Sequence, residues 1–182
     1  MIRRALLSNQ VSQPLSTDLL AKIQEQIERT QHLMEFLPSD ALAWQPNVER
    51  PWSVQQLLVH ITTCLAGFCS VLYAARPERL EHFPELRQLP RLENPDVAAI
   101  RERMCLYGER IQEGFAALED ADLRKVVPTV FVTNGESILT LLLGNLEHLL
   151  NHKHQLFLYL RLMTVEVSSA DLYRFRNTIA PK

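Results

Sequence analysis

The chain has 182 residues, of which 47% are hydrophobic, and a formal net charge of −2 at pH 7. This length fits one domain, or one domain with extensions, and the charge provides no polybasic surface, so we expect no nucleic-acid partner. Only five glycines are present, whereas leucine, glutamine and glutamate are abundant. That composition favours helices over an architecture of strands and turns.

The cysteines indicate a reducing environment. Cys64, Cys69 and Cys105 are odd in number and form no Cys-x-x-Cys pair, so no disulfide framework is expected. The first eight residues contain only a three-residue apolar run, which is too short for the core of a signal peptide. The leucine-rich segment 142–163 is interrupted by charged and histidine side chains and is not expected to span a membrane. These features together predict a cytoplasmic protein.

The amino-terminal part is predicted to divide into an arm and a folded domain. Residues 1–15 have no clear periodicity and are interpreted as an N-terminal arm, so that the domain covers residues 16–182. Apolar residues then recur at helical spacing. This first helix is expected to begin near Ser16 or Thr17, either of which can cap it, and to end at Pro38.

The next segment, residues 38–52, contains two prolines and is predicted to be a loop. We expect its two tryptophans, Trp44 and Trp52, to fill the end of the hydrophobic core rather than to bind a ligand. A second helix is expected to open with a capping box of Ser53 and Gln56 and to close at Arg76.

A long connection separates the second and third predicted helices. Residues 77–95 are rich in proline, glutamate and arginine and are expected to hold at most one short helical turn. A connection of this length permits a crossover between helices that are not hairpin neighbours. The third helix is predicted from about Pro95 to Leu118.

The carboxy-terminal part is predicted to contain one long helix and one short one. The β-branched run 126–133 could be extended, and a capping box of Thr133 and Glu136 is expected to start the fourth helix, which reaches about Met163. This helix is apolar on more than one face, so we expect it to be deeply buried or to pack on a second subunit. A short fifth helix is expected after Ser168.

A candidate metal site comes from histidine spacing. His148 and His152 are four residues apart, so on a helix they share a face and can reach one ion, whereas His154 points away from both. His60 lies at the flank of the second helix, where it could face a helix seam or bond to water. If His60 faces the pair, the result is a three-histidine site with open positions, typical of a metal that does chemistry.

The spacing has simpler explanations as well. Two histidines four apart also occur on surfaces and in cores without a metal, and His-Glu-x-x-His is absent, so no zincin-type protease is indicated. Glu147 and Asn151 are local candidates for orienting a ligating imidazole. Cys64, one turn after His60, could contact the site, but we interpret it as a small buried apolar residue.

Two motifs carry a resemblance to a known family. The segment Trp52-Ser-Val-Gln-Gln-Leu-Leu-Val-His60 resembles the start of helix 2 in the DinB/YfiT-like superfamily. The segment His148-Leu-Leu-Asn-His-Lys-His-Gln155, followed by Leu156-Phe-Leu-Tyr-Leu-Arg161, resembles its helix 4. The resemblance covers roughly residues 16–176, and the order and separation of the motifs match the family's.

The resemblance implies an all-α four-helix bundle in up-down-down-up order with a long crossover, commonly a homodimer. It also implies that His60, His148 and His152 bind a divalent metal, usually zinc or nickel. His154 stands where the family often has glycine. Characterised members include bacillithiol-type and mycothiol-dependent thiol transferases and isomerases, although many members have no established reaction.

Three functional hypotheses follow. The first is a metal-dependent thiol transferase or hydrolase that takes a low-molecular-weight thiol or another small molecule as substrate. The second is a non-enzymatic metal-binding or stress-response module. The third is a metal-free helical dimer in which the histidines are polar residues at a seam. Zinc lowers the pKa of bound water, and ligation to a metal deprotonates a thiol, so the first hypothesis has a chemical basis.

Overall fold

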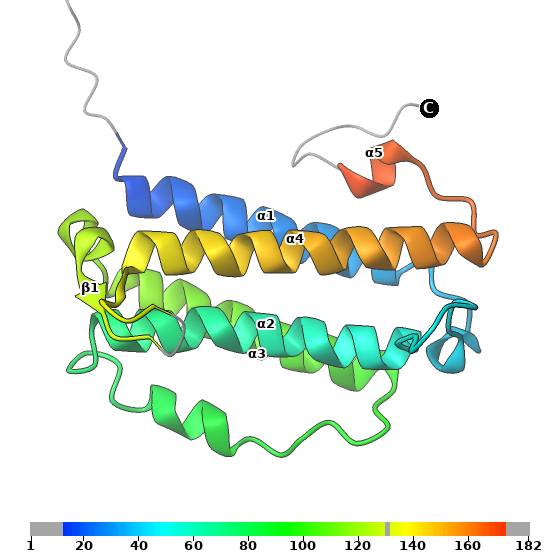
Figure 1. The fold of residues 1–182 in the computed structure, drawn as a ribbon, viewed down its shortest axis with the longest axis horizontal. Helices are drawn as coiled ribbons and strands as arrows, with labels where there is room; N and C mark the ends of the chain where they lie inside the picture. The colour runs from blue at the N-terminus through cyan, green and yellow to red at the C-terminus, as the bar shows by residue number, and fades with distance from the viewer. Residues whose placement is uncertain (1–12, 130–131, 174–182) are drawn as a thin grey trace, which may run out of the picture.

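The computed structural model describes residues 13–129 and 132–173. In this part of the chain, four long helices form a bundle (Figure 1): α1 (Leu15–Met34), α2 (Val54–Ala75), α3 (Val97–Ala116) and α4 (Ile138–Leu162). Helices α1 and α4 run in one direction, and α2 and α3 run in the opposite direction (Figure 1). The predicted fold class, an all-α bundle in up-down-down-up order, is confirmed.

The packing of the bundle brings α2 beside α4. Helix α2 packs against both α3 and α4, and α1 packs against the same two helices. Because α2 and α3 are parallel, the chain must return along the bundle between them, which is what the segment 77–95 does, with the short helix η2 (Phe83–Gln88) on its way (Figure 1). The antiparallel neighbours α2 and α4 therefore face each other along their length.

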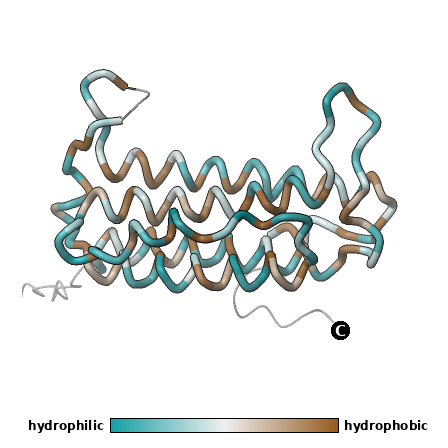
Figure 2. The backbone as a smooth tube through the Cα atoms, turned by 90° about the horizontal axis from the view of Figure 1, so that it is seen from below, coloured by the Kyte–Doolittle hydropathy of each residue, from teal (hydrophilic) through white to brown (hydrophobic). Residues whose placement is uncertain are grey.

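The core is built from the inward faces of these helices, and hydrophobic stretches recur along each of them (Figure 2). Its largest fully buried side chains include Ile23, Leu57, Phe68, Ile100 and Ile111. By length and composition alone, α2 could cross a bilayer, and it is the one described helix that could. Its packing between α3 and α4 accounts for that apolar character, because a core helix of a bundle can be as long and as apolar as a membrane-spanning helix.

Helix α4 is less buried than its composition predicts. Leu143, Leu158 and Leu162 are exposed at 47%, 46% and 63%, so the helix is not deeply buried within one chain, and that half of the expectation is wrong. Packing on a second subunit stays a prediction.

The predicted capping residues can be compared with those observed at the start of each helix. The capping box of α2 is confirmed, because the backbone N–H of Gln56 donates to Ser53 Oγ at 3.2 Å and that of Ser53 donates to Gln56 Oε1 at 2.8 Å. Helix α3 starts after Pro95 and is capped by Asp96 instead. It ends at Ala116, before Leu118.

The predicted cap of α4 is wrong. Ser137 accepts a hydrogen bond from the backbone N–H of Thr140 at 3.1 Å and caps the helix. The reason is a two-stranded antiparallel sheet, β1 (Val126–Val127) and β2 (Glu136–Ser137), which holds Glu136 in extended structure. The remaining short helices are η1 (Ala41–Ala43), η3 (Asp120–Arg124) and α5 (Ser169–Leu172). The predicted short helix after Ser168 is thus present, and Ser168 caps it.

The first helix begins at Leu15, one residue inside the predicted arm, and ends at Met34, before Pro38. Neither Ser16 nor Thr17 is its cap. The carboxylate of Asp120 accepts hydrogen bonds from the backbone N–H of Leu15 at 2.9 Å and of Ser16 at 3.0 Å, and from Ser16 Oγ at 2.7 Å. A distant side chain thus does what a local cap does elsewhere. Residues 1–12 of the predicted arm lie outside the described residues.

This contact predicts a pH-dependent contribution to stability. Hydrogen bonds from the Ser16 hydroxyl and from the backbone of Ser16 and Leu15 hold the pKa of Asp120 below its usual value of 3.8. A carboxylate with a lowered pKa in the folded state stabilises the protein above its unfolded pKa and loses that effect as the pH falls. We expect Asp120→Ala to lower the melting temperature at pH 7, with the difference from wild type shrinking below pH 3.8.

Thermal melts over a pH series would measure this difference. The matched control is Ser16→Ala, which removes one of the three donors and should cause a smaller loss. A difference between wild type and Asp120→Ala that stays constant down to low pH would show that the carboxylate does not act through its charged form.

Candidate metal centre

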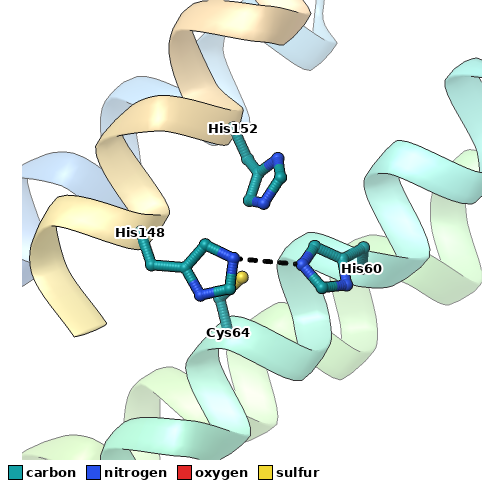
Figure 3. A group of neighbouring side chains, drawn as sticks. All are labelled: His60, Cys64, His148 and His152. Carbon is teal, nitrogen blue, oxygen red and sulfur yellow. Dashed lines mark hydrogen bonds between the residues drawn. The ribbon is translucent and has the colours of Figure 1, made fainter. Parts of the chain in front are cut away.

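Three histidines from two helices point into one space (Figure 3). His60 comes from α2, and His148 and His152 come from successive turns of α4. Their ring centroids lie 4.6 Å apart for His60 and His152, 4.7 Å for His148 and His152, and 5.2 Å for His60 and His148. The Nε2 atoms of His60 and His148 are only 3.2 Å apart. His154 is exposed and lies beside Phe157, outside this group.

A fourth residue belongs to the same cluster. Cys64 lies one turn after His60 on α2, and its sulfur, together with one nitrogen from each histidine, forms a set whose atoms all lie within 4.8 Å of one another. The sequence interpretation took Cys64 as a buried apolar residue; it is buried, but it also lies at the site. The signal that could have revealed it is its spacing from His60, which equals that of the histidine pair.

The electrostatics of the cluster favour neutral imidazoles. Partial burial lowers the pKa of His60, and the nearby His152 and His148 lower it further. The His148 side chain is exposed as a whole, but the partial desolvation of its ring lowers its pKa, and His152 lowers it further. Neutral imidazoles are the form that binds a metal. Among residues 13–129 and 132–173, no carboxylate joins the cluster, so its nitrogen and sulfur donors suit zinc, nickel, copper or iron better than magnesium or calcium.

One residue orients His152 from its far side. Gln155 Oε1 lies 3.0 Å from His152 Nδ1, and because an amide oxygen only accepts, Nδ1 carries the proton and Nε2 keeps its lone pair. Gln155 Nε2 donates to the Tyr159 hydroxyl at 3.0 Å, which donates to the backbone oxygen of Trp52 at 3.2 Å. The candidates Glu147 and Asn151 are both exposed, and the acceptor turns out to be Gln155, three residues after His152 on the same helix.

The two tryptophans have different positions. Trp44 is half-buried and packs edge-on against Tyr159 at 5.3 Å between ring centroids, in keeping with a place at the end of the core. Trp52 is 39% exposed. Its ring lies 4.8 Å from that of His60 and is stacked on that of His152 at 5.7 Å. The expectation that Trp52 fills the core is wrong, because it forms a wall of the histidine cluster.

The cluster opens onto a cavity. A space of about 660 Å³ reaches His60 and Trp52, and its other walls are Gln55, Gln56, Val59, Thr63, Leu92, Glu93, Asn94 and Pro95. It adjoins a second cavity of about 570 Å³ under the segment 77–95, with which it shares Val59, Thr63 and Leu92. Three arginines, Arg87, Arg91 and Arg103, line the second cavity, and no acidic side chain does. A small molecule can therefore approach His60 from the side of the long connection.

Comparison with known proteins places this arrangement in a family. The sequence model of the DinB superfamily matches residues 22–156, which is most of the chain. A search of curated proteins finds no match. The fold resembles the crystal structure of a DinB-like protein from Bacillus subtilis, with a TM-score of 0.63 and 20% sequence identity, over 82% of this chain and 94% of that one. The family assignment and the cluster of three histidines and a cysteine are compatible with metal binding. The chain belongs to the DinB superfamily.

Proposed function

We propose that this protein is a divalent-metal-dependent enzyme that activates a low-molecular-weight thiol, or water, for transfer to a second small molecule. His60, His148 and His152 hold the metal, with zinc or nickel as the expected ion. The observation that carries the proposal is the convergence of three imidazoles beside an open cavity. A structural metal site usually has four protein ligands and no open coordination position, whereas a catalytic site keeps one position open for water or substrate.

The residues around the cluster suit a reaction on a bound small molecule. A divalent ion held here would supply Lewis acidity, which would lower the pKa of a thiol or water bound to it. His148 is exposed and His60 is half-exposed, so a substrate has access to the donors. Trp52 covers one side of His60 and His152 and limits water there, and Gln155 keeps Nε2 of His152 free.

The two adjoining cavities would hold the rest of the substrate. A molecule with its thiol near His60 can extend past Val59 and Thr63 into the space under the segment 77–95. The arginines there favour a substrate with a carboxylate or phosphate group, because Arg pairs with both in a bidentate manner.

A conjugation assay tests the enzymatic proposal. Zinc- or nickel-loaded protein is mixed with cysteine or glutathione and a chromogenic aryl halide, and the initial rate is compared with that of chelator-treated protein and of His148→Ala. We expect a rate above the uncatalysed one that requires the metal and is lost in the variant. Hydrolysis of an activated ester and an activated amide is measured in parallel, since the same site could activate water.

The alternative is a non-enzymatic metal-binding or stress-response module, and thermal melting distinguishes it. His60 comes from α2, and His148 and His152 come from α4, so an ion held by the three histidines would join these helices. A large fall in melting temperature after chelation, with no turnover of any thiol, ester or amide, would favour the module. A small fall together with turnover would favour the enzyme.

The cytoplasmic location, the homodimer and the absence of a membrane or nucleic-acid partner stay predictions. Light scattering of the purified protein would measure the oligomeric state. If a dimer is found, replacing the exposed Leu158 and Leu162 on α4 would test whether this helix forms the dimer interface.

A further inference from the structure

Cys64 occupies a position that mirrors the histidine pair. His60 and Cys64 are four residues apart on α2, and His148 and His152 are four residues apart on α4. Side chains four apart lie on one face of a helix. The antiparallel helices α2 and α4 thus each present two possible metal ligands to the same space. The Cys64 side chain points from α2 into the gap between the two helices (Figure 3).

The distances suit a four-coordinate ion. In a tetrahedral zinc site, with bonds of about 2.0–2.1 Å to nitrogen and about 2.3 Å to sulfur, neighbouring donor atoms lie roughly 3.3–3.6 Å apart. The Nε2 atoms of His60 and His148 are 3.2 Å apart, close to this value. No pair in the set of four exceeds 4.8 Å, so no donor–donor distance is longer than the tetrahedral spacing by more than about 1.5 Å.

The other buried cysteine shows that this placement is specific to Cys64. Cys69 is also on α2, but its sulfur faces α3, 4.0 Å from the backbone oxygen of Tyr107. The third cysteine, Cys105, is exposed on α3. Of the three thiols, Cys64 alone belongs to the cluster of possible ligands.

We propose that Cys64 is the fourth protein ligand of the metal, giving a centre of three histidines and one thiolate. Ligation replaces the S–H bond with a sulfur–metal bond and releases the proton to solvent. The inference rests on metal binding by the three histidines and goes beyond it in two ways. The thiolate would make the site selective for thiophilic ions over manganese and magnesium. Four protein ligands would also fill a tetrahedral site, so the open position that the proposed function needs would exist only if Cys64 leaves the ion or a fifth ligand binds.

Cobalt substitution tests this ligand directly. The exposed thiol is first removed by Cys105→Ala, and Co²⁺ is added to this background and to the same chain carrying Cys64→Ser, Cys64→Ala or the matched control Cys69→Ala. We expect a thiolate-to-cobalt charge-transfer band in the near ultraviolet for the background and for Cys69→Ala, and no such band for either Cys64 variant. We also expect the Cys64 variants to bind Zn²⁺ about 10-fold or more weakly.

The outcomes separate this inference from the proposed function. Visible cobalt absorption without the thiolate band in the background would overturn the inference and leave the three-histidine site in place. A band that survives in Cys64→Ser would also overturn it. Absence of any cobalt spectrum in the background would overturn the metal site and the inference together. Circular dichroism of each variant shows that it is folded, and Cys64→Ser keeps the side-chain size nearly unchanged.

Discussion

Replacing His148 with alanine is expected to weaken divalent-metal binding by more than about 100-fold, since the loss of a residue that only orients a ligand already costs 10- to 100-fold. His148 contributes one of the three imidazoles and its Nε2 lies 3.2 Å from that of His60. It is also exposed, so the alanine leaves no cavity in the core and the fold should be retained. Isothermal titration with Zn²⁺ would measure the change.

The matched control is His154→Ala on the same helix. His154 is exposed and lies outside the cluster, so this variant should bind Zn²⁺ as wild type does. Equal losses in the two variants would mean that the affinity belongs to surface histidines in general. An unchanged affinity in His148→Ala would remove that residue from the ligand set.

Replacing Gln155 with leucine is expected to weaken metal binding by about 10- to 100-fold. Gln155 Oε1 accepts the Nδ1 proton of His152 at 3.0 Å, and leucine has a similar size but no acceptor. The imidazole then loses both its fixed tautomer and its fixed orientation. Competition with a chromophoric chelator would give the affinity.

Two variants show whether the hydrogen bond is responsible. Gln155→Glu keeps an acceptor for His152 Nδ1 and should retain most of the affinity. Tyr159→Phe removes the hydroxyl that receives the amide N–H of Gln155 but leaves Oε1 in place, so its loss should be smaller than that of Gln155→Leu. A leucine variant with wild-type affinity would show that His152 needs no partner.

Local patterns predicted the parts of the site that lie on one helix. The spacing of His148 and His152 fixes their shared face wherever that helix packs, and the capping box at Ser53 and Gln56 acts within four residues. That His60 meets the pair depends on α2 lying beside α4, which spacing alone does not determine. The resemblance of the two motifs to one family supplied that information.

Two of the wrong predictions come from tertiary contacts that override local preferences. Ser16 and Thr17 are good caps in isolation, but the carboxylate of Asp120 reaches the start of α1 and takes that role. Trp52 has the size of a core residue, yet its neighbours are the rings of His60 and His152. The contact between Leu15 and Asp120 spans 105 residues, and that between Trp52 and His152 joins the residues just before α2 to α4, so local preferences do not reveal either one.

Two parts of the site could have been found from the sequence. Cys64 follows His60 at the same spacing as that of the histidine pair, and contact with the site was considered from this spacing but ranked below a place in the core. Gln155 follows His152 by three residues, which is within reach on a helix. The predicted partners, Glu147 and Asn151, lie one residue before a histidine of the pair and are both exposed, whereas Gln155 follows His152 by nearly one turn and reaches its Nδ1.

The most direct test of the metal centre is the metal content of the protein after saturation with Zn²⁺ and removal of free ion. Inductively coupled plasma mass spectrometry would be applied to wild type and to the double variant His148→Ala, His152→Ala, with His154→Ala as the control. We expect one zinc ion per chain in wild type and in the control, and none in the double variant. Wild-type protein that retains no more zinc than the double variant would contradict the account.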